Sequence, residues 1–182
     1  MTSIGSRVFY NCNDLVSVVI PDTVSSIGKE AFADCYNLES VDLPSGLTSI
    51  EDRLFSYCRE LRSIEIPSTV TSIGESAFFE CRKLEDVNLP NALTRIGNNA
   101  FAGCGSFERI YIPSGVTEIG KWAFGNGATH EVYCSVSEEL GTWDYEWNYY
   151  DNCPVYWNAS GLYTDSDYSY ILYNDNTAGI LE

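Results

Sequence analysis

Histidine is almost missing from this chain, whose 182 residues include one, His130. It stands where the repeated pattern of the chain otherwise has leucine, which is typical of a packed or surface residue. A histidine-based catalytic triad and a histidine-rich metal site are therefore excluded. Glycine-rich phosphate loops are missing as well, because the Ile-Gly pairs recur as a structural part of the repeat.

Basic side chains are scarce, with 10 Lys and Arg against 26 Asp and Glu, and the net charge is -16. Such a charge repels phosphate backbones and anionic membrane surfaces. The sequence therefore predicts no nucleic-acid partner and favours partners that present basic patches.

Long apolar runs are absent, since no stretch of about 18 apolar residues is available to cross a membrane. Residues 1–3 also lack the basic and apolar regions of a signal peptide. Ile4 and Gly5 already match the middle of a repeat, so we expect a piece of a longer protein, with the signal and earlier repeats outside this chain. The end at Glu182 fits the same expectation.

Proline and cysteine recur with a period of 23 residues and no insertion or deletion. The prolines are Pro21, Pro44, Pro67, Pro90 and Pro113, and the cysteines are Cys12, Cys35, Cys58, Cys81 and Cys104. A period in this range indicates a solenoid built from stacked coils.

Apolar residues keep fixed positions in the repeat, whereas the positions between them vary among polar types. Two such columns are Ile4, Ile27, Ile50, Ile73, Ile96 and Ile119, and Phe9, Phe32, Phe55, Phe78, Phe101 and Phe124. No single coil could bury its own apolar stripe, so the columns predict one continuous core shared by neighbouring coils.

Each repeat carries its own signals of local structure. The alternation of Leu84, Val87 and Leu89 before Pro90 predicts a short strand ended by proline. Residues 93–96 predict a second short strand, and residues 97–104 predict one or two helical turns. The equivalent first strands, at 17–20, 40–43, 63–66, 86–89 and 109–112, should form a parallel sheet.

The pattern Val-x-x-Ile-Gly-x-x-Ala-Phe-x-x-Cys-x-x-Leu-x-x-Val-x-Ile-Pro, nearly intact at 24–43 and 70–89, resembles the BspA-type leucine-rich repeat family over residues 4–124. Departures are Glu51 in place of Gly, Leu54 in place of Ala and Phe107 in place of Leu, and they concern local packing. The resemblance implies an α/β repeat solenoid, a right-handed leucine-rich repeat superhelix with short parallel strands, short helical turns and a small C-terminal β extension. It also implies a secreted or cell-surface adhesion protein of a bacterium, with protist surface proteins as the second choice.

The repeat dissolves after Phe124, which predicts three segments along the chain. Residues 1–126 form the solenoid of about five coils, residues 127–158 an aromatic C-terminal cap, and residues 159–182 a β extension that begins a following segment. Within the last two, residues 131–134, 168–173 and 179–182 are the predicted strands. The closing role of the cap and the β extension are also what the family resemblance implies.

Five of the seven cysteines occupy the periodic inward column, where neighbouring coils stack about 4.8 Å apart. Metal sites need ligands that converge from several directions, so we interpret these five as buried free thiols. Cys134 and Cys153 fall outside the column, and a disulfide between them remains open.

Outward positions of the first strands predict the binding surface, because a repeat solenoid presents one side chain per coil along an extended face. The predicted partner-binding residues are Asp42, Glu65, Asp86, Asn88, Arg109 and Tyr111. Asp42 and Glu65 have roughly the spacing of a retaining glycosidase pair, but an open sheet offers no pocket to raise one pKa. We therefore expect a protein-binding module and not an enzyme.

Two other functions stay open beside adhesion to an extracellular protein. Trp143 and Trp147 could stack on sugars if they are exposed, or the solenoid could be a spacer without a ligand. We expect no cofactor and no metal site, with calcium at residues 165–167 or 174–176 the weak exception. Open coil edges also allow end-to-end self-association.

Overall fold

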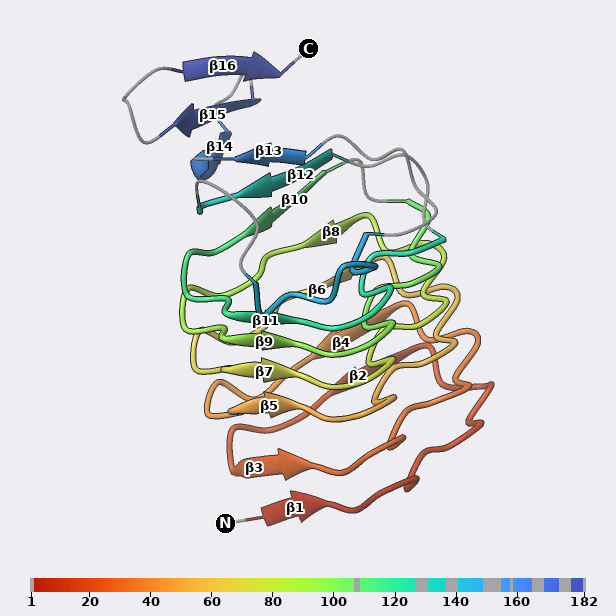
Figure 1. The fold of residues 1–182 in the computed structure, drawn as a ribbon. Helices are drawn as coiled ribbons and strands as arrows, with labels where there is room; N and C mark the ends of the chain where they lie inside the picture. The colour runs from red at the N-terminus through yellow and green to blue at the C-terminus, as the bar shows by residue number, and fades with distance from the viewer. Residues whose placement is uncertain are drawn as a thin grey trace.

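The computed structural model describes residues 2–106, 109–126, 131–136, 141–148, 155–157, 159–164, 169–173 and 178–181, with the side chains of Asp86 and of everything beyond 157 left out. The chain winds into stacked coils from the N-terminus onward, and three further strands follow at the C-terminal end (Figure 1). We number the coils 1 to 5 by their cysteines, Cys12, Cys35, Cys58, Cys81 and Cys104. The predicted solenoid is confirmed.

One side of the solenoid carries the predicted first strands. The strands β2 (Ser17–Val19), β4 (Ser40–Asp42), β6 (Ser63–Ile64) and β8 (Asp86–Val87) form a four-stranded parallel sheet. Its register follows the repeat, with Ser17 opposite Ser40 and Ser40 opposite Ser63. The fifth strand, β10 (Arg109–Ile112), pairs instead with β12 (Glu131–Cys134), which pairs with β13 (Val155–Trp157). The strand predicted at 131–134 is therefore confirmed, and β13 adds one that the sequence did not predict.

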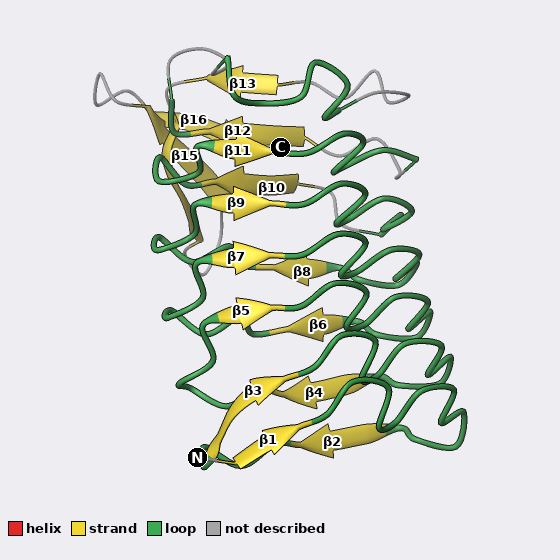
Figure 2. Ribbon diagram, turned by 60° about the horizontal axis from the view of Figure 1, so that its bottom comes forward, coloured by secondary structure: helices red, strands yellow, loops and turns green. Residues whose placement is uncertain are grey.

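The opposite side carries the second strand of each coil (Figure 2). The strands β1 (Thr2–Ile4) and β3 (Val24–Ile27) form a two-stranded sheet, and β5 (Ser49–Ile50), β7 (Ser72–Ile73), β9 (Arg95–Ile96) and β11 (Glu118–Ile119) form a four-stranded one. Pairing is parallel throughout, and it is interrupted between β3 and β5.

The helical turns predicted after each second strand are not confirmed, because the described residues contain tight turns and no helix there. In coil 3 the N–H of Phe55 donates to the Ala77 carbonyl of the next coil at 2.8 Å, whereas the N–H of Ser56 donates within its own turn to Arg53 at 3.2 Å. Arg53 and Tyr57 have positive φ, 55° and 62°, which aims alternate N–H groups along the solenoid axis. A helix this short would leave its first N–H groups without partners, whereas this turn arc bonds them to the next coil.

The core is a stack of identical side chains. Successive rings of the Phe column lie 5.0 to 5.7 Å apart between centroids and are nearly parallel, and from Phe32 onward they are fully buried. Beside them the Cys58 thiol donates to the Phe32 carbonyl of the preceding coil at 3.2 Å, and Cys35, Cys81 and Cys104 make the same bond. These four thiols are buried and unbridged, as predicted, while Cys12 is half-buried. Cys153 lies outside the described residues, so the disulfide stays a prediction.

The C-terminal strands β14 (Ala159–Thr164), β15 (Ser169–Tyr173) and β16 (Ala178–Leu181) form an antiparallel sheet. The last two match the strands predicted at 168–173 and 179–182, and β14 was not predicted. The segment boundaries at 126 and 158 stay predictions. Within the described residues, no helix is long and apolar enough to span a lipid bilayer.

Candidate functional site

The sheet of β2, β4, β6 and β8 presents its outward side chains as an open strand face. Val41 points inward and is buried, whereas its strand neighbours Ser40 and Asp42 are exposed. Glu65 and Asn88, one and two coils further on, are exposed as well. The period-two alternation read from the sequence therefore places these three predicted residues, Asp42, Glu65 and Asn88, on the same face of consecutive coils.

Negative charge on this strand face has no partner. Among the described residues, no Lys or Arg side chain lies within ion-pair distance of Asp42 or Glu65. The nearest paired column is Arg62 with Glu85, whose side chains approach to 3.4 Å. An exposed carboxylate without a counter-ion keeps its full attraction for a basic partner.

The remaining predicted residues are placed differently. Arg109 and Tyr111 belong to β10, in the sheet with β12 and β13, and both are half-buried. The Tyr111 hydroxyl shares a hydrogen bond of 2.6 Å with the Ser135 hydroxyl, which ties it to the segment after β12. The side chain of Asp86 lies outside the described residues. The structure therefore groups Asp42, Glu65 and Asn88 and sets Arg109 and Tyr111 apart from them.

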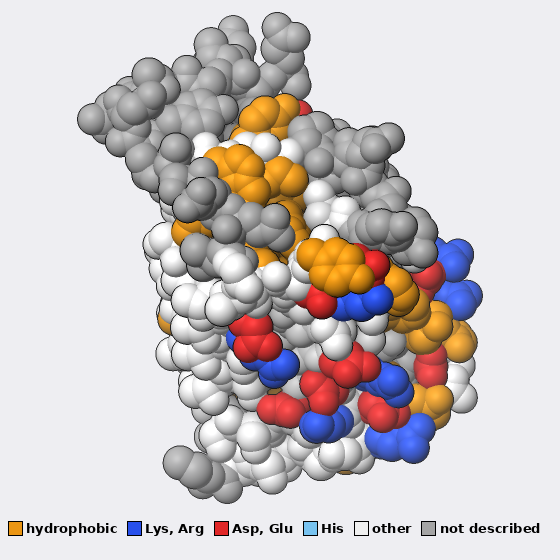
Figure 3. Space-filling model, in the orientation of Figure 1, with side chains coloured by type: hydrophobic (Ala, Val, Ile, Leu, Met, Phe, Trp, Pro, Cys, Tyr) orange, Lys and Arg blue, Asp and Glu red, His pale blue; other side chains and the backbone are white. Residues whose placement is uncertain are grey.

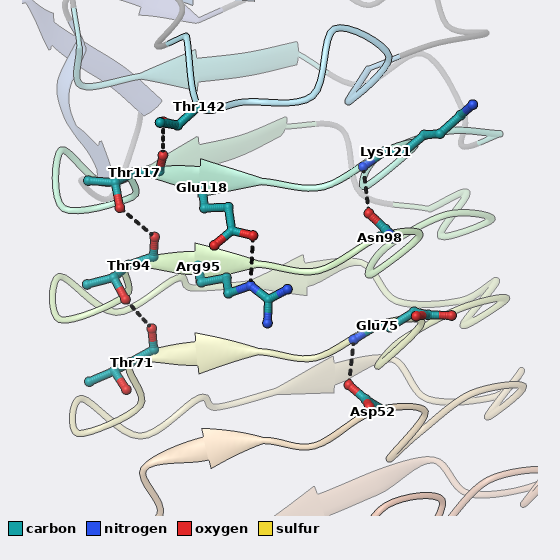
Figure 4. A network of polar contacts seen from close by, with 10 residues as sticks. All are labelled: Asp52, Thr71, Glu75, Thr94, Arg95, Asn98, Thr117, Glu118, Lys121 and Thr142. Atoms are coloured by element: carbon teal, nitrogen blue, oxygen red, sulfur yellow. Dashed lines mark hydrogen bonds and ion pairs between the residues drawn. The ribbon is translucent and has the colours of Figure 1, made fainter.

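On the opposite side, charged groups pair from coil to coil. Acidic and basic side chains lie close together on the face shown in Figure 3. Arg95 contacts Glu118 at 3.0 Å across β9 and β11 (Figure 4). Lys29 contacts Asp52 at 2.6 Å. The hydrogen bond from Lys29 holds the pKa of the Asp52 carboxyl below its usual value. These acids contribute to the fold, because the two ion pairs join neighbouring coils.

Hydrogen bonds between side chains and the backbone of neighbouring coils add to these links. The Asp52 carboxylate accepts the Glu75 N–H and the Asn98 side chain accepts the Lys121 N–H, each at 2.9 Å (Figure 4). A column of threonine hydroxyls donates to the backbone carbonyl of the coil before, as Thr94 does to Thr71 at 3.0 Å. A ligand on this face would have to compete with these contacts for the same side-chain hydrogen-bonding groups.

The two tryptophans of the carbohydrate alternative are buried, each with 5% of its surface exposed. Trp147 packs edge-to-face on Phe124 with ring centroids 5.9 Å apart, and Trp143 packs edge-to-face on Trp147 at 5.4 Å. They close the end of the Phe column. Sugar stacking needs an exposed ring face, so Trp143 and Trp147 do not meet the condition on which the carbohydrate alternative depended.

No group of three or more His, Cys, Asp and Glu side chains converges to hold a metal in the part of the chain that the structure describes. His130 and the calcium candidates at 165–167 and 174–176 lie outside that part. Burial raises the pKa of the Cys58 and Cys81 thiols well above the ordinary value, which suppresses thiolate chemistry.

Sequence reasoning missed a group of side chains on the turn arcs of coils 1 to 4. Tyr10 and Tyr36 are exposed, and Tyr57, Arg59 and Phe79 lie beside them in the next two coils. The aromatic residues among them depart from columns that hold small or polar residues in most other coils. This departure from the repeat was the signal available in the sequence. It was missed because the fold is predicted from the positions that stay constant from coil to coil.

Solved structures similar to this chain are bacterial leucine-rich repeat proteins. One from T. pallidum has a TM-score of 0.66 and 28% identity over 85% of this chain and 80% of its own. One from Eubacterium ventriosum ATCC 27560 has a TM-score of 0.63 and 29% identity, over 68% of this chain. One from Bacteroides ovatus ATCC 8483 has a TM-score of 0.53 and 25% identity, over 73% of this chain. The chain spans 33% and 46% of these last two proteins.

A search of curated proteins gives no match. The family model described as the BspA type leucine-rich repeat region matches residues 2–130 with six copies. That match covers most of the chain, and it agrees with the observed coils and with the pattern of Gly, Phe and Cys columns. The chain belongs to the BspA-type leucine-rich repeat family.

Proposed function

We propose that this chain is a non-catalytic binding module of a secreted or cell-surface protein, and that it adheres through its strand face to a protein on a host or neighbouring cell. The observation that carries the proposal is the contrast in charge pairing. Asp42 and Glu65 stand exposed and unpaired on the strand face, whereas acids on the opposite side are tied to Lys or Arg of a neighbouring coil.

Physical chemistry favours a basic partner for this face. Unpaired carboxylates on consecutive coils attract a row of Lys or Arg side chains and speed the encounter, while Ser40, Ser63 and Asn88 supply neutral hydrogen-bonding groups. Binding of this kind should weaken as salt rises, because the interacting charges are solvent-exposed. Location outside the cell belongs to the same proposal, which rests on membership of the family.

The test is a binding screen on an array printed with extracellular matrix proteins and glycans, with and without a calcium chelator. The double variant Asp42→Lys with Glu65→Lys should lose most of the signal on the protein spots. The matched control is Asp14→Lys with Glu75→Lys, which makes the same charge change away from the strand face. Asp14 has no ion pair in the described part of the chain, and Glu75 contacts Arg53 only at 4.0 Å.

Each outcome decides between functions. Loss in the face variant with retention in the control supports adhesion through the strand face, and equal loss in both would show a general charge effect instead. Binding to the glycan spots alone would show that the protein binds sugars through a site other than the strand face. Silence from protein shown to be folded would overturn the proposal and leave the spacer as the function.

A further inference from the structure

The turn arcs of coils 1 to 4 carry a group of side chains that the repeat does not require. We call it the turn-edge cluster, and it consists of Tyr10, Tyr36, Tyr57, Arg59 and Phe79. Tyr10 and Tyr36 are 40% and 37% exposed, which is unusual for side chains of their size. Hydrophobic side chains alternate with charged ones along this edge of the solenoid (Figure 3).

Arg59 stands at the centre of the cluster and differs from the other basic residues. Its guanidinium carbon lies 4.9 Å from the centroid of the Tyr36 ring and 5.8 Å from that of Tyr57. No carboxylate of a described residue pairs with it, whereas eight of the ten Lys and Arg side chains contact one within 4.0 Å. Two aromatic rings therefore hold the guanidinium in place and leave its N–H donors for an outside acceptor.

Neighbouring acids are already engaged, so they do not neutralise Arg59. Glu80 contacts Arg82 at 2.7 Å, and Glu60 contacts Lys83 at 2.6 Å. The Asp34 carboxylate raises the pKa of Tyr10. The cluster is thus a local exception on a strongly acidic chain, with one cation that lacks an anionic partner.

Tyr57 occupies a backbone position that disfavours it. Its φ is 62°, in the left-handed region that bulky residues rarely adopt. The same position in other coils holds residues that are small or polar, namely Asn11, Asp34, Glu80, Gly103 and Asn126. A tyrosine at this strained position places its ring 5.3 Å from Phe79, edge to face, and within reach of Arg59.

We propose that the turn-edge cluster is a second docking surface, which takes a protein segment carrying a carboxylate beside an apolar side chain. Exposed Tyr and Arg residues are the types that dominate binding energy at protein interfaces. The carboxylate pairs with the guanidinium of Arg59, and the apolar group covers the rings of Tyr57 and Phe79. This surface selects an acidic partner, so it is distinct from the strand face, which selects a basic one.

A random peptide library displayed on phage and selected on the immobilised folded protein tests the proposal. Enriched peptides should carry Asp or Glu next to an aromatic or aliphatic residue. Binding of a synthetic enriched peptide should weaken at least about tenfold in Arg59→Ala, as expected for the centre of an interface. The matched control is Arg62→Ala, which removes the same charge from an exposed residue paired with Glu85 and should bind unchanged.

A second variant separates binding from folding. Tyr57→Asn installs the residue found at the equivalent positions 11 and 126, so it should keep or raise the unfolding midpoint while peptide affinity falls. Enrichment no better than on a bare support would overturn the proposal. Peptides that bind Arg59→Ala as well as the parent protein, or a Tyr57→Asn variant with full affinity, would overturn it equally.

Discussion

The sheet of β2, β4, β6 and β8 runs unbroken through coils 1 to 4, whereas the strands on the opposite side divide between β3 and β5. Both sides repeat every 23 residues and share the same core. Turn arcs also join coils 2 and 3 normally, as the Phe32 N–H donates to the Leu54 carbonyl at 3.1 Å. The interruption is therefore local to one side of one junction, and its cause should lie in residues specific to that place.

Glycine follows the second strand at positions 5, 28, 74, 97 and 120, and Glu51 replaces it in coil 3. A Cβ built on Gly97 would lie 2.7 Å from the backbone nitrogen of Glu75, closer than side chains ever approach. The Gly97 N–H donates to the Ile73 carbonyl at 2.8 Å, and Gly28, Gly74 and Gly120 make the same bond. Glu51 makes no such bond to Ile27 among the described contacts. We infer that a Cβ at this position prevents the second strands of neighbouring coils from pairing.

The difference between the two sides shows where this repeat tolerates change. Outward positions of the first strands hold Ser, Asp, Glu or Asn without effect on pairing, because their side chains point to solvent. The second strands are followed by a position where backbone meets backbone, which admits only glycine if the ladder is to continue. Outward side chains of the strand face can therefore vary at little cost to stability.

The largest effect is expected from copying the coil 3 substitution into an intact junction. Gly97→Glu should interrupt the pairing of β7 with β9 and destabilise the protein by about 2–4 kcal/mol, since overpacking adds to lost hydrogen bonds. The measurement is the free energy of unfolding in urea. Gly46→Glu is the control, because a Cβ at Gly46 meets no atom within 4 Å. Equal losses in the two variants would refute the account of the interruption.

Periodicity predicted the solenoid, the first strands and the outward direction of Asp42 and Glu65, because a fixed period forces each column to one side of the chain. It could not predict the turn arcs. Positive φ at Arg53 and Tyr57 is disfavoured by propensity and is stabilised by N–H bonds to the next coil, which no local pattern reveals. The sequence shows Glu51 as a departure from the repeat. Its effect on strand pairing depends on the backbone of the neighbouring coil, which the sequence does not show.

The sequence predicted an aromatic cap over residues 127–158 but left open whether Trp143 and Trp147 are buried within it or exposed. The repeat ends at Phe124, so no column indicates which side of the following segment faces the core. Both tryptophans pack beyond Phe124 as a lid on the aromatic stack. Aromatic composition alone is compatible with a lid and with a sugar platform, and only the exposed fraction of the rings separates them.

A smaller effect is expected from acid, because the open junction between coils 2 and 3 is spanned by the ion pair of Lys29 and Asp52. Lys29 lowers the pKa of Asp52, so this stabilisation is present above the unfolded pKa near 4 and is lost as pH falls through the folded value. Both side chains are largely exposed, which limits the contribution to about 0.5 kcal/mol. The difference in unfolding free energy between the parent and Asp52→Asn, followed from pH 6 to pH 3, measures it. A difference that does not shrink in acid would contradict this role for the pair.

The smallest change in the free energy of unfolding is expected from Glu51→Gly. This variant also tests most directly why the second strands are interrupted between β3 and β5. Removing the Cβ lets coil 3 approach coil 2, so the N–H at position 51 gains the Ile27 carbonyl, a bond worth about 1 kcal/mol. The variant also loses the hydrogen bond from the Ser49 hydroxyl to Glu51, and glycine adds freedom to the unfolded chain that costs about 0.5–1 kcal/mol. These terms nearly cancel, so the unfolding free energy should move by less than about 0.5 kcal/mol.

Hydrogen exchange of single amides makes the closure visible even though the stability hardly changes. In the parent protein the N–H of Glu51 has no acceptor among the described contacts, whereas the N–H of Gly74 donates to the Ile50 carbonyl at 2.8 Å. In Glu51→Gly the two should become similarly protected, while Gly74 itself stays unchanged. If position 51 stays open without its Cβ, the interruption is set by something other than that atom, and the ion pair of Lys29 and Asp52 becomes the next group to remove.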